Sequence, residues 1–103
     1  IYPREIEEKI LLHPGITETA VLGIPDPVWG EAGVAVCVAR PGADPSAIDL
    51  RGWLDGKVAR YKLPKITVFW EAMPKSAYGK ITKKMIREEL QRRGEIPAPD
   101  AGA

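Results

Sequence analysis

The stretch ITETAVLGIPDPVWGEAGVAVCVAR, residues 16–40, decides the fold class of this chain. Residues 16–24 are rich in β-branched side chains, which predicts a β-strand. Residues 33–40 are small or branched apolar residues and predict a second strand. The two prolines between these runs predict an irregular connection over residues 25–31. We therefore expect the two strands to pair as a hairpin with a wide loop.

Apolar residues recur at helical spacing on both sides of this hairpin. Upstream, residues 3–13 predict an amphipathic helix that ends at the sequence His13-Pro14-Gly15. Downstream, residues 45–58 predict a second helix, capped by Asp44 or Ser46. Helices placed in this way can cover a sheet.

The remainder of the chain predicts one further strand and one further helix. Residues 66–70 are branched and aromatic, as in a short strand. Residues 82–93 predict a helix in which two glutamates each stand four residues before an arginine, with Gly94 as its stop signal. The resulting order predicts an α+β fold, a small two-layer sandwich with an about three-stranded sheet covered by helices. We expect one domain over residues 1–94 and a flexible tail over residues 95–103.

The net charge of +1 hides an uneven distribution of charge along the chain. Residues 1–56 carry four Lys/Arg against nine Asp/Glu, and residues 57–103 carry eleven against five. The basic half predicts either an anionic partner or an ordinary solvated surface. A nucleic-acid-binding module is one alternative, but aromatic residues do not interleave with the basic residues of the last helix.

Length and composition bound the cellular context. The chain of 103 residues begins at Ile1 without methionine, so we expect a fragment of a longer polypeptide. The single cysteine, Cys37, cannot form an internal disulfide, and no apolar run reaches membrane-spanning length. We expect a cytoplasmic location, with a peripheral membrane association of the full-length polypeptide as the alternative. Cys37 is expected to be a core residue and not a nucleophile.

The best candidate for chemistry is a lysine in the segment MPKSAYGKI, residues 73–81. Pro74 and Gly79 bracket a stretch unsuited to strand or helix, so Lys80 is expected on an exposed loop. A lysine there offers a mobile positive charge to phosphate or carboxylate oxygens. The spacing of glycines excludes a P-loop, because Pro74 stands where the first glycine belongs.

Several short motifs occur in a fixed order along the chain. They are IYPREIE (1–7), HPG (13–15), GIPD with GE (23–26 and 30–31), YKLPK (61–65), and PK with GKI (74–75 and 79–81). Together they resemble the C-terminal domain of acyl-CoA synthetases, the AMP-dependent synthetase and ligase family within the adenylate-forming superfamily. The resemblance covers about residues 1–94. Tyr78 departs from the family, in which a serine or threonine is common before the glycine.

The resemblance implies a lid that works with a large N-terminal adenylation domain. In this family the large domain binds ATP with Mg²⁺ and a carboxylic acid, and the lid brings the glycine-lysine loop to them. The lid then rotates for thioester formation with coenzyme A. Lys80 matches the catalytic lysine, Gly79 belongs to the ATP and acyl-adenylate loop, and the isolated domain is expected to be inactive.

Two further lysines are candidates for contacts with other molecules. Lys62 and Lys65 stand on a stiff proline-containing segment, where they either meet coenzyme A phosphates, meet acidic groups of the large domain, or are simply solvated. His13 is expected to be a helix-end residue, and no metal site is expected. Trp29 is expected to pack against its own core.

Two alternatives and one form of regulation complete the expectations. A non-catalytic interaction domain would use the same fold without catalysis by Lys80. No nucleic-acid partner is expected. Acetylation of Lys80 by a lysine acetyltransferase would remove its charge and abolish adenylation while the fold persists.

Overall fold

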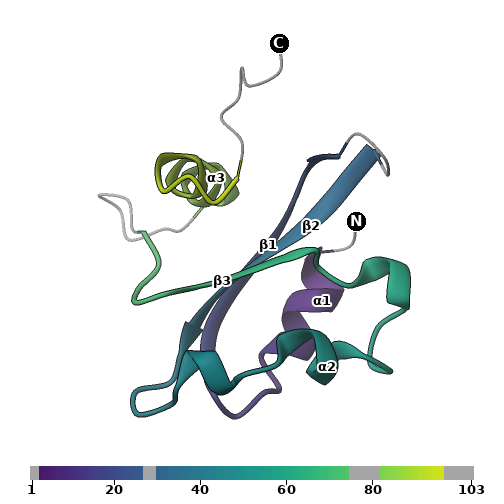
Figure 1. The fold of residues 1–103 in the computed structure, drawn as a ribbon, viewed down its shortest axis with the longest axis vertical. Helices are drawn as coiled ribbons and strands as arrows, with labels where there is room; N and C mark the ends of the chain where they lie inside the picture. The colour runs from purple at the N-terminus through teal and green to yellow at the C-terminus, as the bar shows by residue number, and fades with distance from the viewer. Residues whose placement is uncertain (1–2, 27–29, 75–81, 97–103) are drawn as a thin grey trace. The chain divides into compact units, whose positions relative to one another are not determined.

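The structure is a computed structural model that describes residues 3–26, 30–74 and 82–96. It divides into two compact units, residues 1–71 and residues 72–103, which we call the sheet unit and the C-terminal unit (Figure 1). The expected single domain over residues 1–94 stays a prediction.

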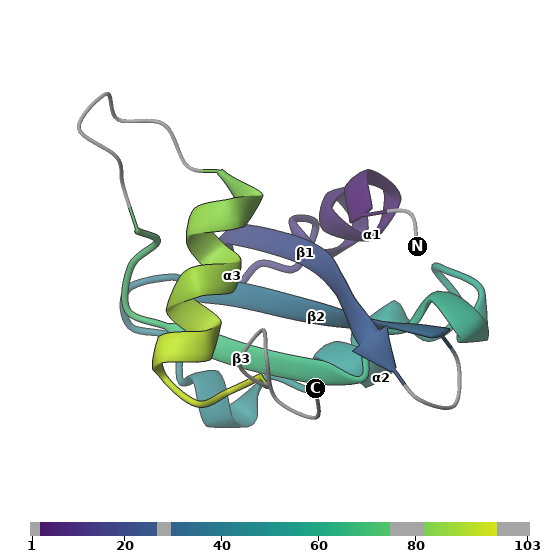
Figure 2. The same ribbon diagram turned by 90° about the horizontal axis from the view of Figure 1, so that it is seen from above.

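The sheet unit is built on three strands with the order β1-β2-β3. β1 (Ile16–Asp26) pairs antiparallel with β2 (Gly30–Ala39), and β3 (Ile66–Trp70) pairs parallel with β2. Figure 2 shows the three strands side by side with β2 in the middle. The hairpin and the third strand are therefore confirmed. A parallel pair needs a long crossover, which residues 40–65 provide.

The prediction of an irregular connection over residues 25–31 is wrong at both ends. β1 continues through Pro25, which lies opposite Glu31, and Asp26 lies opposite Gly30. The proline is tolerated because β1 is an edge strand, where a missing N–H can point away from the partner strand. Residues 27–29, which include Trp29, lie outside the described residues.

Two helices cover the same face of the sheet, α1 (Pro3–Ile10) and α2 (Leu50–Leu54) (Figure 1). Their apolar side chains and those of the two long strands form one buried cluster: Ile6, Ile10, Ile16, Val21, Ala35, Cys37, Leu50, Leu54 and Val58. Ile6 and Ile10 are one helical turn apart, so both point to the sheet. The expected α+β sandwich with a three-stranded sheet is confirmed.

The first helix ends earlier than predicted, at Ile10 and not at His13. The N–H groups of Leu12 and His13 donate to carbonyls three residues back, so the chain tightens beyond the helix. His13 Nδ1 then accepts the N–H of Gly15 at 2.9 Å. His13 therefore lies in the turn that follows the helix, three residues beyond its end.

The prediction of one helix over residues 45–58 is wrong, because two short helices occur there. η1 (Pro45–Ala47) is followed by α2, and Ile48 between them is extended, with φ −91° and ψ 113°. Asp44 caps η1 as expected, and a second aspartate, Asp49, accepts the N–H of Gly52 and starts α2 anew. A further short helix, η2 (Arg60–Lys62), was not predicted.

The C-terminal unit contains α3 (Lys83–Arg92), which confirms the last predicted helix. Thr82 caps it by accepting the N–H of Met85 at 3.2 Å, and Gly94 follows its end with φ 74°. Glu89 forms ion pairs with both Arg92 and Arg93. The spacing of four residues had predicted Glu88 as the partner of Arg92. Among the residues described, no helix is long and apolar enough to cross a membrane.

The expected flexible tail over residues 95–103 stays a prediction, and its first two residues are described. The N–H of Glu95 donates to Leu90 O at 2.9 Å, and Ile96 is buried. Residues 97–103 lie outside the described part of the chain.

Candidate active site

In the sequence, the predicted catalytic loop belongs to the C-terminal unit. Pro74 is the last described residue before it, and Thr82, the cap of α3, is the first after it. Lys80, Gly79 and Tyr78 lie outside the described residues, so the role of Lys80 stays a prediction.

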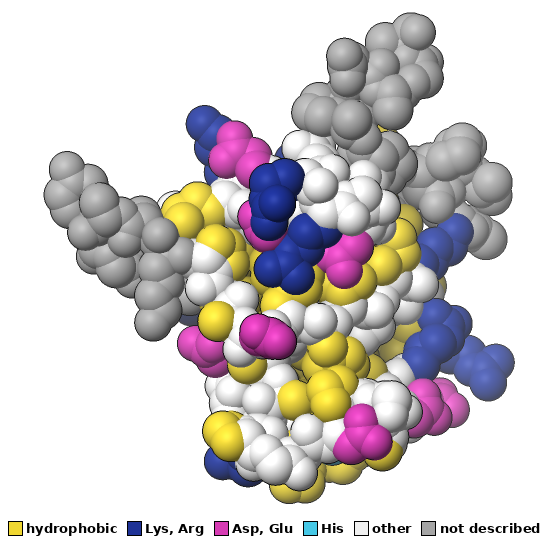
Figure 3. Space-filling view, turned by 60° about the vertical axis from the view of Figure 1, so that its left-hand side comes forward, with side chains coloured by type: hydrophobic (Ala, Val, Ile, Leu, Met, Phe, Trp, Pro, Cys, Tyr) yellow, Lys and Arg dark blue, Asp and Glu magenta, His cyan; other side chains and the backbone are white. Residues whose placement is uncertain are grey.

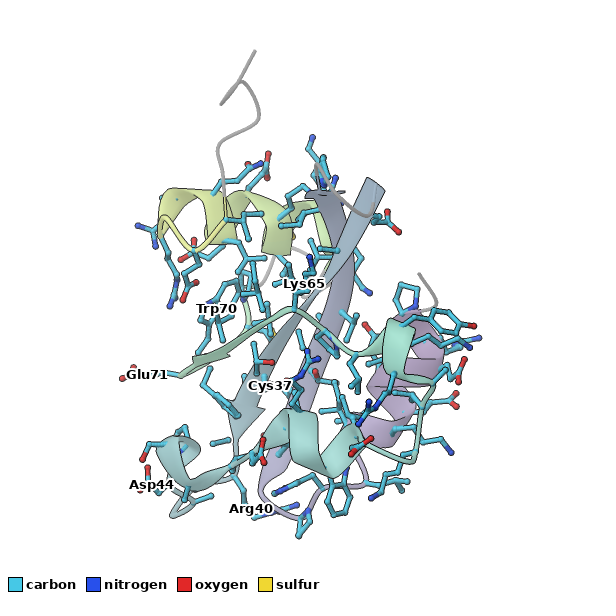
Figure 4. The ribbon with its side chains drawn as sticks, turned by 45° about the vertical axis from the view of Figure 1, so that its right-hand side comes forward. Cys37, Arg40, Asp44, Lys65, Trp70 and Glu71 are labelled. Carbon is cyan, nitrogen blue, oxygen red and sulfur yellow. The ribbon has the colours of Figure 1, made fainter. Side chains whose placement is uncertain are left out.

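The other two candidate lysines belong to a short segment of the sheet unit, residues 60–65, which we call the contact segment. Its helical turn η2 is closed by bonds from Lys62 N to Ala59 O at 2.8 Å and from Leu63 N to Arg60 O at 3.1 Å. Pro64 follows, and Lys65 N donates to Gly33 O at 2.9 Å, immediately before β3 pairs with β2. Figure 4 shows Lys65 at the start of β3. The backbone of this segment is therefore well defined by hydrogen bonds.

The side chain of Lys62 turns back onto α1. Its Nζ lies 2.9 Å from Glu5 Oε2, and the lysine side chain is only 17% exposed. The same ammonium lies 5.8 Å from the centroid of the Tyr61 ring, within the range of a cation–π contact. Lys62 thus joins two elements of the fold, whereas the side chain of Lys65 is exposed.

Tyr61 is the residue that our sequence reasoning missed. Its side chain is 82% exposed, the largest value among the exposed large apolar residues described. Tyrosine offers a flat apolar ring with a polar tip, and such residues are common at interfaces. The signal was present in the sequence, because Tyr61 stands between two basic residues, Arg60 and Lys62.

An open depression of about 510 Å³ lies between α2 and the contact segment. Its lining residues are Asp49, Arg51, Gly52, Asp55, Arg60 and Leu63. Two aspartates and two arginines balance each other there, so the depression does not favour a strongly anionic ligand. Arg51 also has a structural contact, because its Nη1 donates to Pro64 O at 3.1 Å.

Cys37 lies in the core, on the face of the sheet that α1 and α2 cover (Figure 4). Burial raises the pKa of its thiol to about 11, although a contact with the Thr19 hydroxyl acts in the opposite direction. Cys37 is thus confirmed as a core residue and does not supply a nucleophile at neutral pH. No group of three metal-binding side chains occurs in the described ranges.

The basic half of the chain is partly neutralised by its own acidic residues. Hydrogen bonds from Arg92 and then Arg93 lower the pKa of Glu89 to about 2, so this carboxylate stays charged beside them. In Figure 3, basic and acidic side chains lie next to one another on the face shown. This intermingling does not favour a nucleic-acid interface.

Comparison with known proteins identifies the family to which this domain belongs. Residues 5–80 match the family described as the AMP-binding enzyme C-terminal domain. The match covers most of the chain, includes the contact segment and ends at Lys80. The chain therefore belongs to this family, as its resemblance to the C-terminal domain of acyl-CoA synthetases implied.

Individual relatives agree with this assignment. The chain is 41% identical over 90 residues to a feruloyl-CoA synthase of an Amycolatopsis species, which covers 87% of this chain and 18% of the relative. It is 43% identical over 89 residues to a long-chain-fatty-acid–CoA ligase of Mycobacterium tuberculosis, covering 86% and 18%. Among solved structures, ATP-bound MatB from Rhodopseudomonas palustris matches with a TM-score of 0.78 and 37% identity, over 88% of this chain and 18% of that one.

The chain thus spans less than a fifth of the length of these relatives. The activity of a whole enzyme therefore enters only as a proposal.

Proposed function

We propose that this chain is the C-terminal catalytic lid of an ATP-dependent, AMP-forming acid–thiol ligase. The observation that carries the proposal is the family match over residues 5–80, which extends through the predicted catalytic loop to Lys80. The similarity to a CoA synthase and a CoA ligase supports the reaction class. On this proposal the isolated chain is inactive, because the acid and ATP are bound mainly by an N-terminal adenylation domain.

The proposed reaction has two steps. The carboxylate oxygen attacks the α-phosphorus of ATP, which forms the acyl-adenylate and releases pyrophosphate. The sulfur of coenzyme A, having lost its proton, then attacks the acyl carbon, which forms the thioester and releases AMP.

Lys80 is proposed to act in the first step. The attack brings two anions together, and negative charge accumulates on the oxygens of the transferring group. A lysine brought to these oxygens can orient the reactants and stabilise the transition state more than the separated substrates. Mg²⁺ enters as part of the ATP substrate and shares this neutralisation. Gly79 leaves the backbone before Lys80 without a Cβ that could obstruct a ligand.

The contact segment is proposed to meet the thiol substrate or the large domain. Arg60, Tyr61 and Lys65 are exposed in this segment, and Tyr61 with Lys65 offers an aromatic ring and a cation on the same short stretch of chain. Such a pair suits a ligand that carries both a phosphate and a purine ring, as coenzyme A does. Lys62 is paired with Glu5 and lies near the Tyr61 ring.

Two further proposals concern the location of the full enzyme and its regulation. We place the full enzyme in the cytoplasm, in line with the lone Cys37. We also propose that a lysine acetyltransferase could silence the enzyme at Lys80, because acetylation removes the positive charge that adenylation needs.

The reaction class is tested in the polypeptide that carries these residues together with its adenylation domain. ATP–pyrophosphate exchange is measured with a panel of fatty, aryl, short-chain and amino acids, and again after removal of residues 1–103. We expect exchange that depends on one class of acid and falls at least about 100-fold in the truncated form, because the lid supplies transition-state stabilisation. Exchange that is equally fast without these residues would contradict a catalytic lid.

A further inference from the structure

The contact segment is anchored to the rest of the sheet unit by three elements. Lys62 Nζ lies 2.9 Å from Glu5 Oε2 of α1, and Arg51 Nη1 of α2 donates to Pro64 O at 3.1 Å. Lys65 N donates to Gly33 O of β2 at 2.9 Å. The first of these contacts joins residues 57 positions apart in the sequence.

The ammonium of Lys62 is partly covered and is paired within the fold. Its side chain is 17% exposed, whereas the paired Glu5 side chain is 41% exposed. A phosphate that approached Lys62 would also approach the Glu5 carboxylate, which repels it. Lys62 therefore carries a charge that is already compensated within the fold.

Lys62 also restrains the ring of Tyr61. Tyr61 is 82% exposed, and a side chain with so few neighbours would sample several rotamers. The Lys62 ammonium at 5.8 Å from the ring centroid favours the rotamer that faces it. A ring that is already oriented loses less entropy on binding a partner.

From these contacts we propose that Lys62 is a positioning residue. Through its ion pair with Glu5 it holds the contact segment and the Tyr61 ring for binding coenzyme A, while Tyr61 and Lys65 make the contacts themselves. The inference rests on the proposed function of this segment. It separates two lysines that the sequence alone treats alike.

The decisive variant is Glu5→Gln in the full enzyme, because it leaves Lys62 in place and removes the carboxylate charge that pairs with it. If Lys62 positions the segment, the KM for coenzyme A in thioester formation rises about two- to fivefold, which matches the strength of a partly exposed ion pair. If Lys62 instead contacts a phosphate directly, freeing its charge leaves this KM unchanged or lowers it, which would overturn the proposal. Glu8→Gln, on an exposed position of the same helix, is the matched control and leaves the KM unchanged.

A charge exchange gives a second, independent readout. Lys62→Glu alone should raise the KM for coenzyme A, and adding Glu5→Lys should bring it back to within about twofold of the wild type, since the ion pair is restored in reverse. A direct phosphate contact would not be rescued, because a carboxylate would then face the phosphate. Lys65→Gln should raise the KM in either background.

Adenylation is measured in every variant, so that a failure of the proposed function can be distinguished from a failure of the positioning role of Lys62. Acid-dependent ATP–pyrophosphate exchange should stay within about twofold of the wild type in the Glu5 and Lys62 variants, because the ion pair acts on the second step. A wild-type enzyme without any exchange would refute the proposed function itself. Normal exchange with an unchanged KM in Glu5→Gln would refute only the positioning role of Lys62.

Discussion

At the scale of single residues, surroundings decide what a side chain can do. Cys37 and Lys62 are both reactive residue types, yet the first is fully buried and the second is paired with a carboxylate. Cys37 was predictable as a core residue, because its neighbours in sequence are valines and alanines. The Glu5–Lys62 pair was not predictable, since local patterns carry no information on partners 57 residues apart.

The Cys37 thiol makes folding stability depend on pH. Its pKa is raised from 9.0 to about 11 in the folded protein, chiefly by burial. The unfolded chain therefore releases this proton at lower pH than the folded chain. The contribution is fully present below pH about 9 and is lost as the pH rises toward about 11.

We expect the melting temperature to fall as the pH rises through this range, and to fall less in Cys37→Ala. Thermal unfolding of both proteins between pH 8 and pH 11 is followed by circular dichroism. The difference in melting temperature between the wild type and Cys37→Ala isolates the thiol, because lysines and tyrosines titrate in both proteins. An identical pH dependence in the two proteins would show that the thiol is not shielded from water.

At the scale of secondary-structure elements, the residues that begin or end a helix or strand decided how well its bounds could be predicted. β3 was predicted with its correct bounds, because five branched and aromatic residues stand after a proline. The end of β1 was predicted wrongly, because a proline is a strong breaker only where its N–H is needed by a partner. The second helix was overextended, because a short side-chain cap such as Asp49 can restart a helix inside an apolar pattern.

The cap of α3 can be tested directly, and it lies next to the loop that carries Lys80. Thr82→Ala removes the acceptor of the Met85 N–H, which is made at 3.2 Å. We expect a loss of about 1 kcal/mol in the stability of this helix, together with faster amide hydrogen exchange in its first turn. Thr82→Ser keeps the hydroxyl and should behave like the wild type. Equal exchange in all three proteins would mean that the cap contributes nothing.

At the scale of the whole molecule, the sequence predicted the fold class and the family, but not how the strands run. The order of helices and strands and five short motifs pointed to an α+β lid domain, and the three-stranded sheet and the family match agree. The parallel direction of β3 could not be predicted, because it depends on how the crossover over residues 40–65 packs on the sheet. The functional claim, in turn, rests on Lys80, which stands outside the described residues.

The measurement that tests this claim most directly separates the two half-reactions of the full enzyme in Lys80→Ala. The account predicts that ATP–pyrophosphate exchange falls at least about 100-fold, because the charge that stabilises the adenylation transition state is gone. Thioester formation from added acyl-adenylate and coenzyme A should stay within a few-fold of the wild type, and Lys84→Ala should leave both steps unchanged. Wild-type exchange in Lys80→Ala would contradict the account and favour a domain that uses this fold only for interaction.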